Sequence, residues 1–109
     1  MATIEATFVQ GNTAPDIVAQ LHDELTPTIP LNLAGALGVR FQMRKPDDGR
    51  FTVDAAATVT NPSQGLVSYS WAADDLNIDG EYDVQWQVTF ADGKKQTVAK
   101  ANRILVRRQ

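Results

Sequence analysis

In the segment 80–90, GEYDVQWQVTF, every second residue from the third onward is large and apolar. These residues are Tyr82, Val84, Trp86, Val88 and Phe90. Successive side chains of a strand point to opposite faces, so this spacing predicts a β-strand with one buried and one solvated face. Strands of this kind are typical of antiparallel sheets that have one side open to water.

A tight turn and a returning strand follow this segment. Asp92 and Gly93 stand between two alternating runs, and an Asp-Gly pair in that position is a strong hairpin signal. The returning strand is expected over 96–99 and 103–106, with a bulge or kink at Asn102. The sequence therefore predicts a β-hairpin in which Asp92 and Gly93 have a structural role.

Further strands precede the hairpin at regular intervals. Extended segments are predicted at 39–44, 51–59 and 67–71. The turns between them are 45–49 (KPDDG) and 61–65 (NPSQG), in which proline presets the backbone and glycine accepts a positive φ. Short strands separated by such turns indicate a β-sandwich or barrel, and the class is therefore all-β.

The segment 15–25 fits two secondary structures. Ile17, Leu21 and Leu25 are spaced as one face of a helix, and Pro15 suits the first turn of that helix. The same segment also offers apolar residues at every second position, which is the spacing of a strand. The local pattern alone slightly favours the helix.

The composition is that of an ordinary globular chain, with 109 residues, 43% of them hydrophobic, and a net charge of −3. This length suffices for one core, so we expect a single domain over residues 1–109. The absence of cysteine excludes disulfides and thiolate metal sites, and the single histidine, His22, excludes multi-histidine sites. The acidic balance argues against nucleic acid as a partner, and neither a signal peptide nor a membrane span is expected.

The loop before the strongest strand matches the first half of a calcium-binding loop. Asp75, Asn77 and Asp79 occupy its first three ligand positions, and Gly80 occupies the turn position. The final position should supply a bidentate carboxylate, and Trp86 stands there instead. The motif is an incomplete calcium candidate, and an acidic turn before a strand explains it better.

Tyr82 has a structural explanation. A tyrosine at the start of a late strand, just after a tight turn at Gly80, is typical of the tyrosine corner of immunoglobulin-like sandwiches. In that corner the phenol hydrogen-bonds to nearby backbone. Phe41, Trp71 and Trp86 are in phase with the apolar faces of their strands, so we expect them in the core rather than on a sugar-stacking platform.

No catalytic arrangement emerges from the sequence. The adjacent pairs Asp47/Asp48 and Asp74/Asp75 point apart in an extended chain, whereas a glycosidase needs two converging carboxyl groups. No serine or threonine near His22 stands in a recognisable nucleophile context, so this histidine is expected at the surface. We therefore expect a scaffold or binding module without enzymatic activity and without a cofactor.

Positive charge is concentrated late in the sequence, at Lys94, Lys95, Lys100, Arg103, Arg107 and Arg108. Charges on a strand edge discourage aggregation. They equally suit a contact with an acidic partner surface, and the pattern leaves both explanations open.

Several stretches, taken in order, point to a known family. They are Gly11-Asn12-Thr13 with Pro15, Asn32 to Ala36 leading into 39–44, Gly65 to Trp71 with Asp75-Leu76, Gly80-Glu81-Tyr82, and Phe90 to Lys94. The series resembles the immunoglobulin-like N-terminal domain of the baseplate upper protein family of tailed bacteriophages. Asn12 replaces the family's aspartate and keeps the turn chemistry. The resemblance implies a strand over 17–23 in place of the helix.

The resemblance also implies the fold and the role. It implies an immunoglobulin-like antiparallel β-sandwich of about seven to nine strands. It implies a structural protein of the virion, made in the bacterial host cytoplasm, that attaches tail or baseplate subunits to one another in many symmetry-related copies. Capsid decoration, a neck position and a host-surface carbohydrate-binding module are the alternatives. Nucleic acid and membranes are not expected partners.

The expected contact surface is taken from exposed loops and charges. It comprises the end loop with Asp47, Asp48 and Arg50, the loop 74–79, and the basic last strand with Arg103 and Arg107. A standard interface buries about 800 Å² of each partner, which is a reasonable share of so small a surface.

Overall fold

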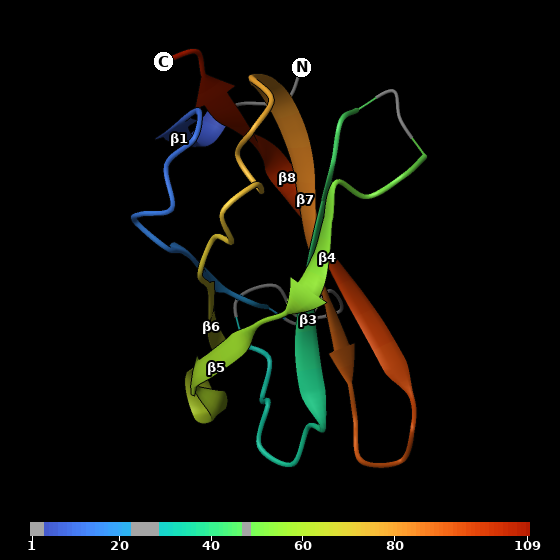
Figure 1. Cartoon of the computed structure of the whole chain (residues 1–109). Helices are drawn as coiled ribbons and strands as arrows, with labels where there is room; N and C mark the ends of the chain where they lie inside the picture. The colour runs from blue at the N-terminus through green and yellow to red at the C-terminus, as the bar shows by residue number, and fades with distance from the viewer. Residues whose placement is uncertain (1–3, 23–28, 47–48) are drawn as a thin grey trace.

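The computed structural model describes residues 4–22, 29–46 and 49–109 of the chain. These residues form eight strands in two facing sheets and one short 3-10 helix, η1 (Figure 1). No helix in this part of the chain is long and apolar enough to cross a membrane. The elements in chain order are β1 Ile4–Val9, β2 Ile17–Gln20, β3 Gly38–Arg44, β4 Val53–Ala56, β5 Thr58–Asn61, η1 Pro62–Gln64, β6 Leu66–Tyr69, β7 Gly80–Thr89 and β8 Lys95–Arg107.

The strands are arranged as a sandwich. One sheet has the order β1-β8-β7-β3-β4, and the other has the order β2-β6-β5. Every pair is antiparallel except β1 with β8, which run parallel. The prediction of an all-β, immunoglobulin-like sandwich of about seven to nine strands is therefore confirmed.

The strand predicted from the alternating segment 80–90 is β7, at the centre of the larger sheet. Its alternate residues from Tyr82 to Val88 are buried, and those between them are at least partly exposed. The hairpin turn to β8 places Gly93 at φ +86°, and the Phe90 amide donates to the Lys94 carbonyl at 2.8 Å. Figure 1 shows this hairpin, in orange, reaching the end of the molecule opposite the C-terminus.

The last strand carries the interruption that the sequence predicts. Asp83 pairs with Arg103, but Gln85 pairs with Ala99. Residues 100–102 of β8 therefore stand opposite a single residue of β7, and the predicted kink at Asn102 lies within this interval. Bulges of this kind increase the local twist of a sheet.

The segment 15–25 contains a strand, so the helix favoured by its local pattern is wrong. β2 pairs antiparallel with β6, as Ile17 with Tyr69 and Gln20 with Leu66. Ile17 and Leu21 face the core and are 7% and 0% exposed. Pairing with β6 satisfies the backbone groups on one edge of β2, and this tertiary contact outweighs the weak local preference for a helix. Leu25, which belonged to the helical pattern, lies outside the described residues.

The predicted extended segment 51–59 is divided between the two sheets. β4 lies at the edge of the larger sheet and β5 at the edge of the smaller one. The single residue between them, Ala57, donates its amide to the Val39 carbonyl at 2.8 Å. The chain thus crosses from one sheet to the other and closes this side of the sandwich.

The core is organised around Phe41, which is fully buried. Its ring stacks on Tyr69, with centroids 4.8 Å apart and planes at 16°. The rings of Trp71 and Trp86 lie 5.5 and 4.9 Å from it, edge-on and tilted respectively. Residues from both sheets contribute to this cluster, so it joins the two layers.

The first strand, β1, is absent from the sequence predictions. It pairs in parallel with the second half of β8, as Ala6 with Ile104 and Phe8 with Val106. Phe8 is buried and meets Trp71 edge-on, with centroids 5.1 Å apart. β1 therefore extends the larger sheet and covers one side of the aromatic core.

Candidate functional site

Three segments that are distant in the sequence meet at one end of the sandwich. They are the turn between β3 and β4, the loop 72–79 between β6 and β7, and the end of β8 at 107–109. A hollow of about 190 Å³ joins the first two and is lined by Thr52, Asp74, Asp75, Asn77, Ile78 and Tyr82. The end of β8 adjoins the loop 72–79 through Arg108, whose Nε lies 3.7 Å from Asp79 Oδ2. We call this surface the loop end.

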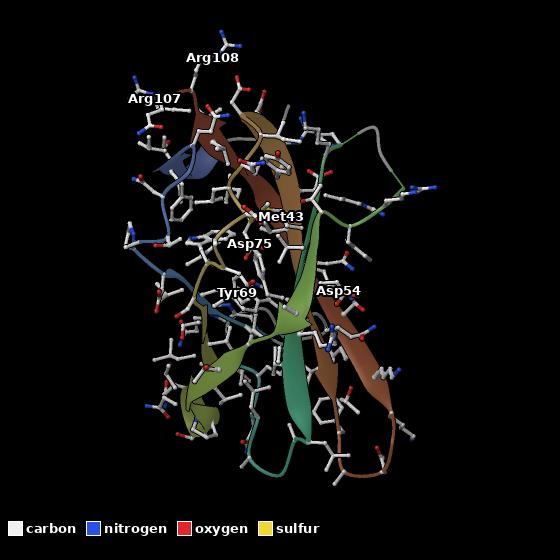
Figure 2. All side chains as sticks on the ribbon, viewed as in Figure 1. Met43, Asp54, Tyr69, Asp75, Arg107 and Arg108 are labelled. Atoms are coloured by element: carbon white, nitrogen blue, oxygen red, sulfur yellow. The ribbon has the colours of Figure 1, made fainter. Side chains whose placement is uncertain are left out.

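A carboxylate inside the loop 72–79 gives the loop a defined shape. Asp75 Oδ2 accepts hydrogen bonds from the Tyr69 hydroxyl and, at 2.8 Å, from the Ala72 amide. The Asp75 amide in turn donates to the Ala72 carbonyl at 3.1 Å. Figure 2 shows Tyr69 and Asp75 lying close together near the middle of the molecule. The loop is thereby tied to the last residue of β6.

Tyr82 attaches the other end of the same loop. Its hydroxyl donates to the Ile78 carbonyl at 2.7 Å, and its side chain is 1% exposed. This is the backbone hydrogen bond that a tyrosine corner contains. The ammonium group of Lys45 lies 5.9 Å from the centre of the Tyr82 ring, so the β3–β4 turn also contacts this corner.

The loop end combines apolar and charged side chains at its surface. Ile78 is 55% exposed and Phe51 is 36% exposed, and the Arg44 guanidinium lies 5.6 Å from the centre of the Phe51 ring. Arg107 and Arg108 project outward from the end of β8 (Figure 2). An apolar centre with a charged rim is the usual composition of a protein–protein interface.

The calcium candidate residues make separate contacts. Asp75 accepts the two hydrogen bonds described above, and Asp79 faces Arg108. The backbone carbonyl of Asn77 accepts a hydrogen bond from Gln10 Nε2 at 2.8 Å. Residues 4–22, 29–46 and 49–109 contain no group of three or more acidic or histidine side chains that could hold a metal ion. This arrangement gives no support to the calcium interpretation.

The residues expected at the interface are divided between different places. Arg50 is exposed in the β3–β4 turn and Arg107 is exposed at the end of β8. Arg103 instead lies on the outer face of the larger sheet, where its Nε donates to Asp83 Oδ1 at 2.9 Å. Asp47 and Asp48 lie outside the described residues. The structure thus places Arg50 and Arg107 at the loop end and Arg103 away from it.

The residues given structural roles lie in the core or at turns. Trp86 is fully buried and its Nε1 has no hydrogen-bond partner among the described residues. Trp71 is 5% exposed and donates from Nε1 to the Pro15 carbonyl at 3.1 Å. Asp92 Oδ1 accepts from the Lys94 amide at 3.0 Å in the opposite end of the sandwich. With both indole rings buried, neither offers a face on which a sugar could stack.

The sequence analysis expected a contact in the loop 74–79 without naming Ile78 within it, and it did not predict a contact role for Phe51. Ile78 carried only an ambiguous signal, because it follows Leu76 by two residues and is in phase with Tyr82. That spacing also fits the buried face of a strand. The contact of Lys45 with Tyr82 carried no such signal, since it depends on the arrangement of β3 beside β7.

Tyr69 makes the stability of the fold sensitive to alkaline pH. Burial, reinforced by the hydrogen bond to Asp75, raises the pKa of Tyr69 from 10.0 to about 12. Between these two values the unfolded chain loses the phenol proton while the folded chain keeps it. The contribution of Tyr69 to the unfolding free energy is therefore complete below pH 10 and is lost as the pH rises towards 12.

We expect the unfolding free energy of the wild type to fall more steeply above pH 10 than that of Tyr69→Phe. Urea unfolding of both proteins at several alkaline pH values measures the two slopes. The pKa of Tyr82 is also raised by burial, but that residue is common to both proteins and cancels in the comparison. Equal slopes would show that the Tyr69 proton is not held by the fold.

Comparison with known proteins supplies a family for this arrangement. The family model of the BppU N-terminal domain matches residues 15–104 of the chain. The matched region runs from the residues before β2 into the second half of β8, and it contains the loop 72–79 and Tyr82. A search of the curated proteins found no match to this chain.

Proposed function

Because the chain belongs to the BppU N-terminal domain family, a family of bacteriophage baseplate structural domains, we propose that it attaches one virion subunit to another without catalysing a reaction. In this proposal residues 1–109 act as one domain, present in many copies under the symmetry of a tailed-phage particle. Its partners are other virion proteins of the tail or baseplate. The family membership supports a baseplate structural role, and the loop end supports a contact surface for it.

The observation that carries the proposal is that Ile78 is exposed on a loop whose conformation is held by hydrogen bonds. The Ile78 side chain is 55% exposed, while its backbone carbonyl is held by the buried Tyr82 hydroxyl at 2.7 Å. A side chain on a loop that is already ordered loses little conformational freedom on binding. A few side chains that become buried near the centre of an interface supply most of the binding free energy. Ile78 therefore suits a central contact of the loop end.

The charged rim gives this surface its selectivity. Arg107 and Arg108 are exposed at the end of β8, and Asp74 is exposed in the loop 72–79. The loop end thus carries both positive and negative side chains, and a partner must place the opposite charge against each of them. Charges at a rim act mainly on the choice of partner and the rate of association.

A pair of matched variants tests the proposal. Ile78→Asp introduces a charge at the loop end, and Leu37→Asp introduces the same charge at a 71% exposed residue next to β3, where the chain leaves the loop 29–37. Both side chains are more than half exposed, so both variants should unfold at nearly the wild-type urea concentration. We expect Ile78→Asp to lower the number of copies in purified phage particles by at least about tenfold, and Leu37→Asp to lower it less than about twofold.

The measurement is quantitative mass spectrometry of particles assembled with each variant in place of the wild-type chain. Electron cryo-microscopy of the same particles distinguishes a baseplate position from the neck or capsid. Normal incorporation of Ile78→Asp would show that the loop end is not the attachment surface. Equal loss with both variants would point to general destabilisation of the particle contact.

A further inference from the structure

Edge strands of a sheet expose unpaired backbone groups, and proteins usually protect them. In this sandwich the edges are β1 and β4 in one sheet and β2 and β5 in the other. The register of β1 shifts between Ile4 and Ala6, and that of β5 shifts between Val59 and Asn61. β4 carries Asp54, whose carboxylate accepts from Arg40 Nε at 2.8 Å. Three of the four edges therefore carry a bulge or a charge.

β2 has neither kind of protection. Its sequence, IVAQ, contains no charged residue and no proline. Its pairing with β6 is regular over all four residues, without a shift of register. Among the described residues, β2 pairs with no strand other than β6. An edge whose pairing is regular and whose residues are uncharged is suited to pairing with another strand.

The backbone of β2 presents donors and acceptors at this edge. The Leu21 amide donates to the Gly65 carbonyl at 2.8 Å, towards the β6 side. Bonded and non-bonded pairs alternate along an antiparallel ladder, so Ala19 also directs its amide and carbonyl to β6. Val18 and Gln20 then direct theirs to the open edge. With respect to the described strands, which pair β2 with β6 alone, these two residues each offer one donor and one acceptor to a partner strand.

The side chains beside this edge are uncharged. Val18 is 70% exposed. It borders a groove of about 330 Å³ that is lined by Val18, Ala19, Gln20, Thr60, Leu66 and Val67. The outer face of the larger sheet differs, because it carries the ion pairs Arg40–Asp54 and Asp83–Arg103. A surface without charge favours a partner strand that is also uncharged, since a buried unpaired charge is costly.

We propose that the open edge of β2 pairs antiparallel with β2 of a second copy of this chain, about a two-fold axis at Ala19. Val18 of each copy then stands opposite Gln20 of the other. These are the two residues whose amide and carbonyl groups face the edge, so they can form the hydrogen bonds between the copies. The two three-stranded sheets become one continuous six-stranded sheet. The same strand occurs on both sides of this contact, as a two-fold interface requires.

Hydrogen-bonding complementarity between a carboxylate and an imidazole favours a second copy as the occupant. In this register Asp16, which precedes β2, stands opposite His22 of the second copy, and the two are on the same face as Val18. Asp16 is exposed and His22 is half-buried, where it bridges Pro30. The strand between them carries no charge, so the pairing opposes no like charges. The pairing does not depend on the attachment role proposed above, because it uses a different surface.

Sedimentation velocity over a range of concentrations tests the pairing. We expect the wild type to form a dimer reversibly. Val18→Lys places a charge on the open edge of β2, and Ala56→Lys places the same charge on the exposed edge of β4. Val18→Lys should raise the dissociation constant of the dimer by at least about tenfold, and Ala56→Lys should change it by less than about twofold.

A single introduced cysteine tests the register. The chain has no cysteine, so Ala19→Cys gives one thiol at the proposed axis. Residue 19 would face its own copy in a non-bonded pair, with Cα atoms about 4.5 Å apart, which a disulfide spans. Mild oxidation should cross-link most of Ala19→Cys and little of Ala56→Cys.

If the chain stays monomeric up to about 1 mM, the proposal is wrong. The edge of β2 would then be a candidate for pairing with a strand of another virion protein. A dimer that Val18→Lys leaves intact, or a dimer in which Ala19→Cys does not cross-link, would overturn the proposal as well.

Discussion

Gly65→Ala is expected to lower the unfolding free energy by about 2–5 kcal/mol, although it adds only one methyl group. A Cβ at this position would lie 2.6 Å from the Leu21 carbonyl oxygen and 2.8 Å from that of Leu31. Both contacts are with backbone, and neither carbonyl can move away freely. The Leu21 carbonyl accepts the Leu31 amide at 2.8 Å, and the Leu21 amide donates to Gly65.

The matched control for this variant is Gly93→Ala. Both glycines have a positive φ, +66° at Gly65 and +86° at Gly93, so both replacements carry the backbone strain of an L-residue in that region. Nothing lies within 4 Å of a Cβ at Gly93, so its loss should be only about 1–2 kcal/mol. Equilibrium urea unfolding gives both values, and equal losses would show that the close approach at Gly65 relaxes at no cost.

Phe41→Ala is expected to lower the unfolding free energy by about 3–5 kcal/mol. Phe41 is fully buried and its ring contacts Tyr69, Trp71 and Trp86 within 5.5 Å between centroids. Its removal leaves a cavity at the point where the two sheets meet. Because three aromatic rings lose a partner together, the surrounding side chains have little means of filling this space.

Phe51→Ala is the control for this second variant. Phe51 is 36% exposed at the loop end, where the Arg44 guanidinium lies over its ring. The same deletion of a ring should lower the unfolding free energy by less than about 1 kcal/mol there. Tryptophan fluorescence follows the unfolding of both proteins, since Trp71 and Trp86 report on the core. A loss below about 1 kcal/mol for Phe41→Ala would mean that the core does not depend on this ring.

The strands that the sequence predicted correctly are those whose pattern is local. In β7 a strict alternation separates a buried face from a solvated one, and the glycine of the following turn marks the hairpin. β2 was ambiguous because Ile17 and Leu21 fit both a helix and a strand, and pairing with β6 decided between them. β1 was not predicted, although Ile4, Ala6 and Phe8 alternate with Glu5 and Thr7. Its place in the sheet depends on parallel pairing with residues 103–107, almost a hundred residues later.

The candidate site was predictable in part for the same reason. The acidic motif from Asp75 to Gly80 correctly located a tight loop before β7. Its role in the fold was not predictable, because Asp75 accepts from Tyr69 on the preceding strand. Arg103 was expected at the interface, but the register of β8 against β7 places it opposite Asp83. That register depends on the bulge at 100–102, whose size the sequence does not define.

The parallel pair of β1 and β8 determines how the sandwich responds to mechanical force. β1 begins beside Arg103 and ends beside Arg107, so the two strands run side by side in the same direction. A pull that separates Ile4 from Arg107 acts along both strands and strains their hydrogen bonds together. Under this shear the hydrogen bonds between β1 and β8 must break together. A pull across the strands would break them one after another.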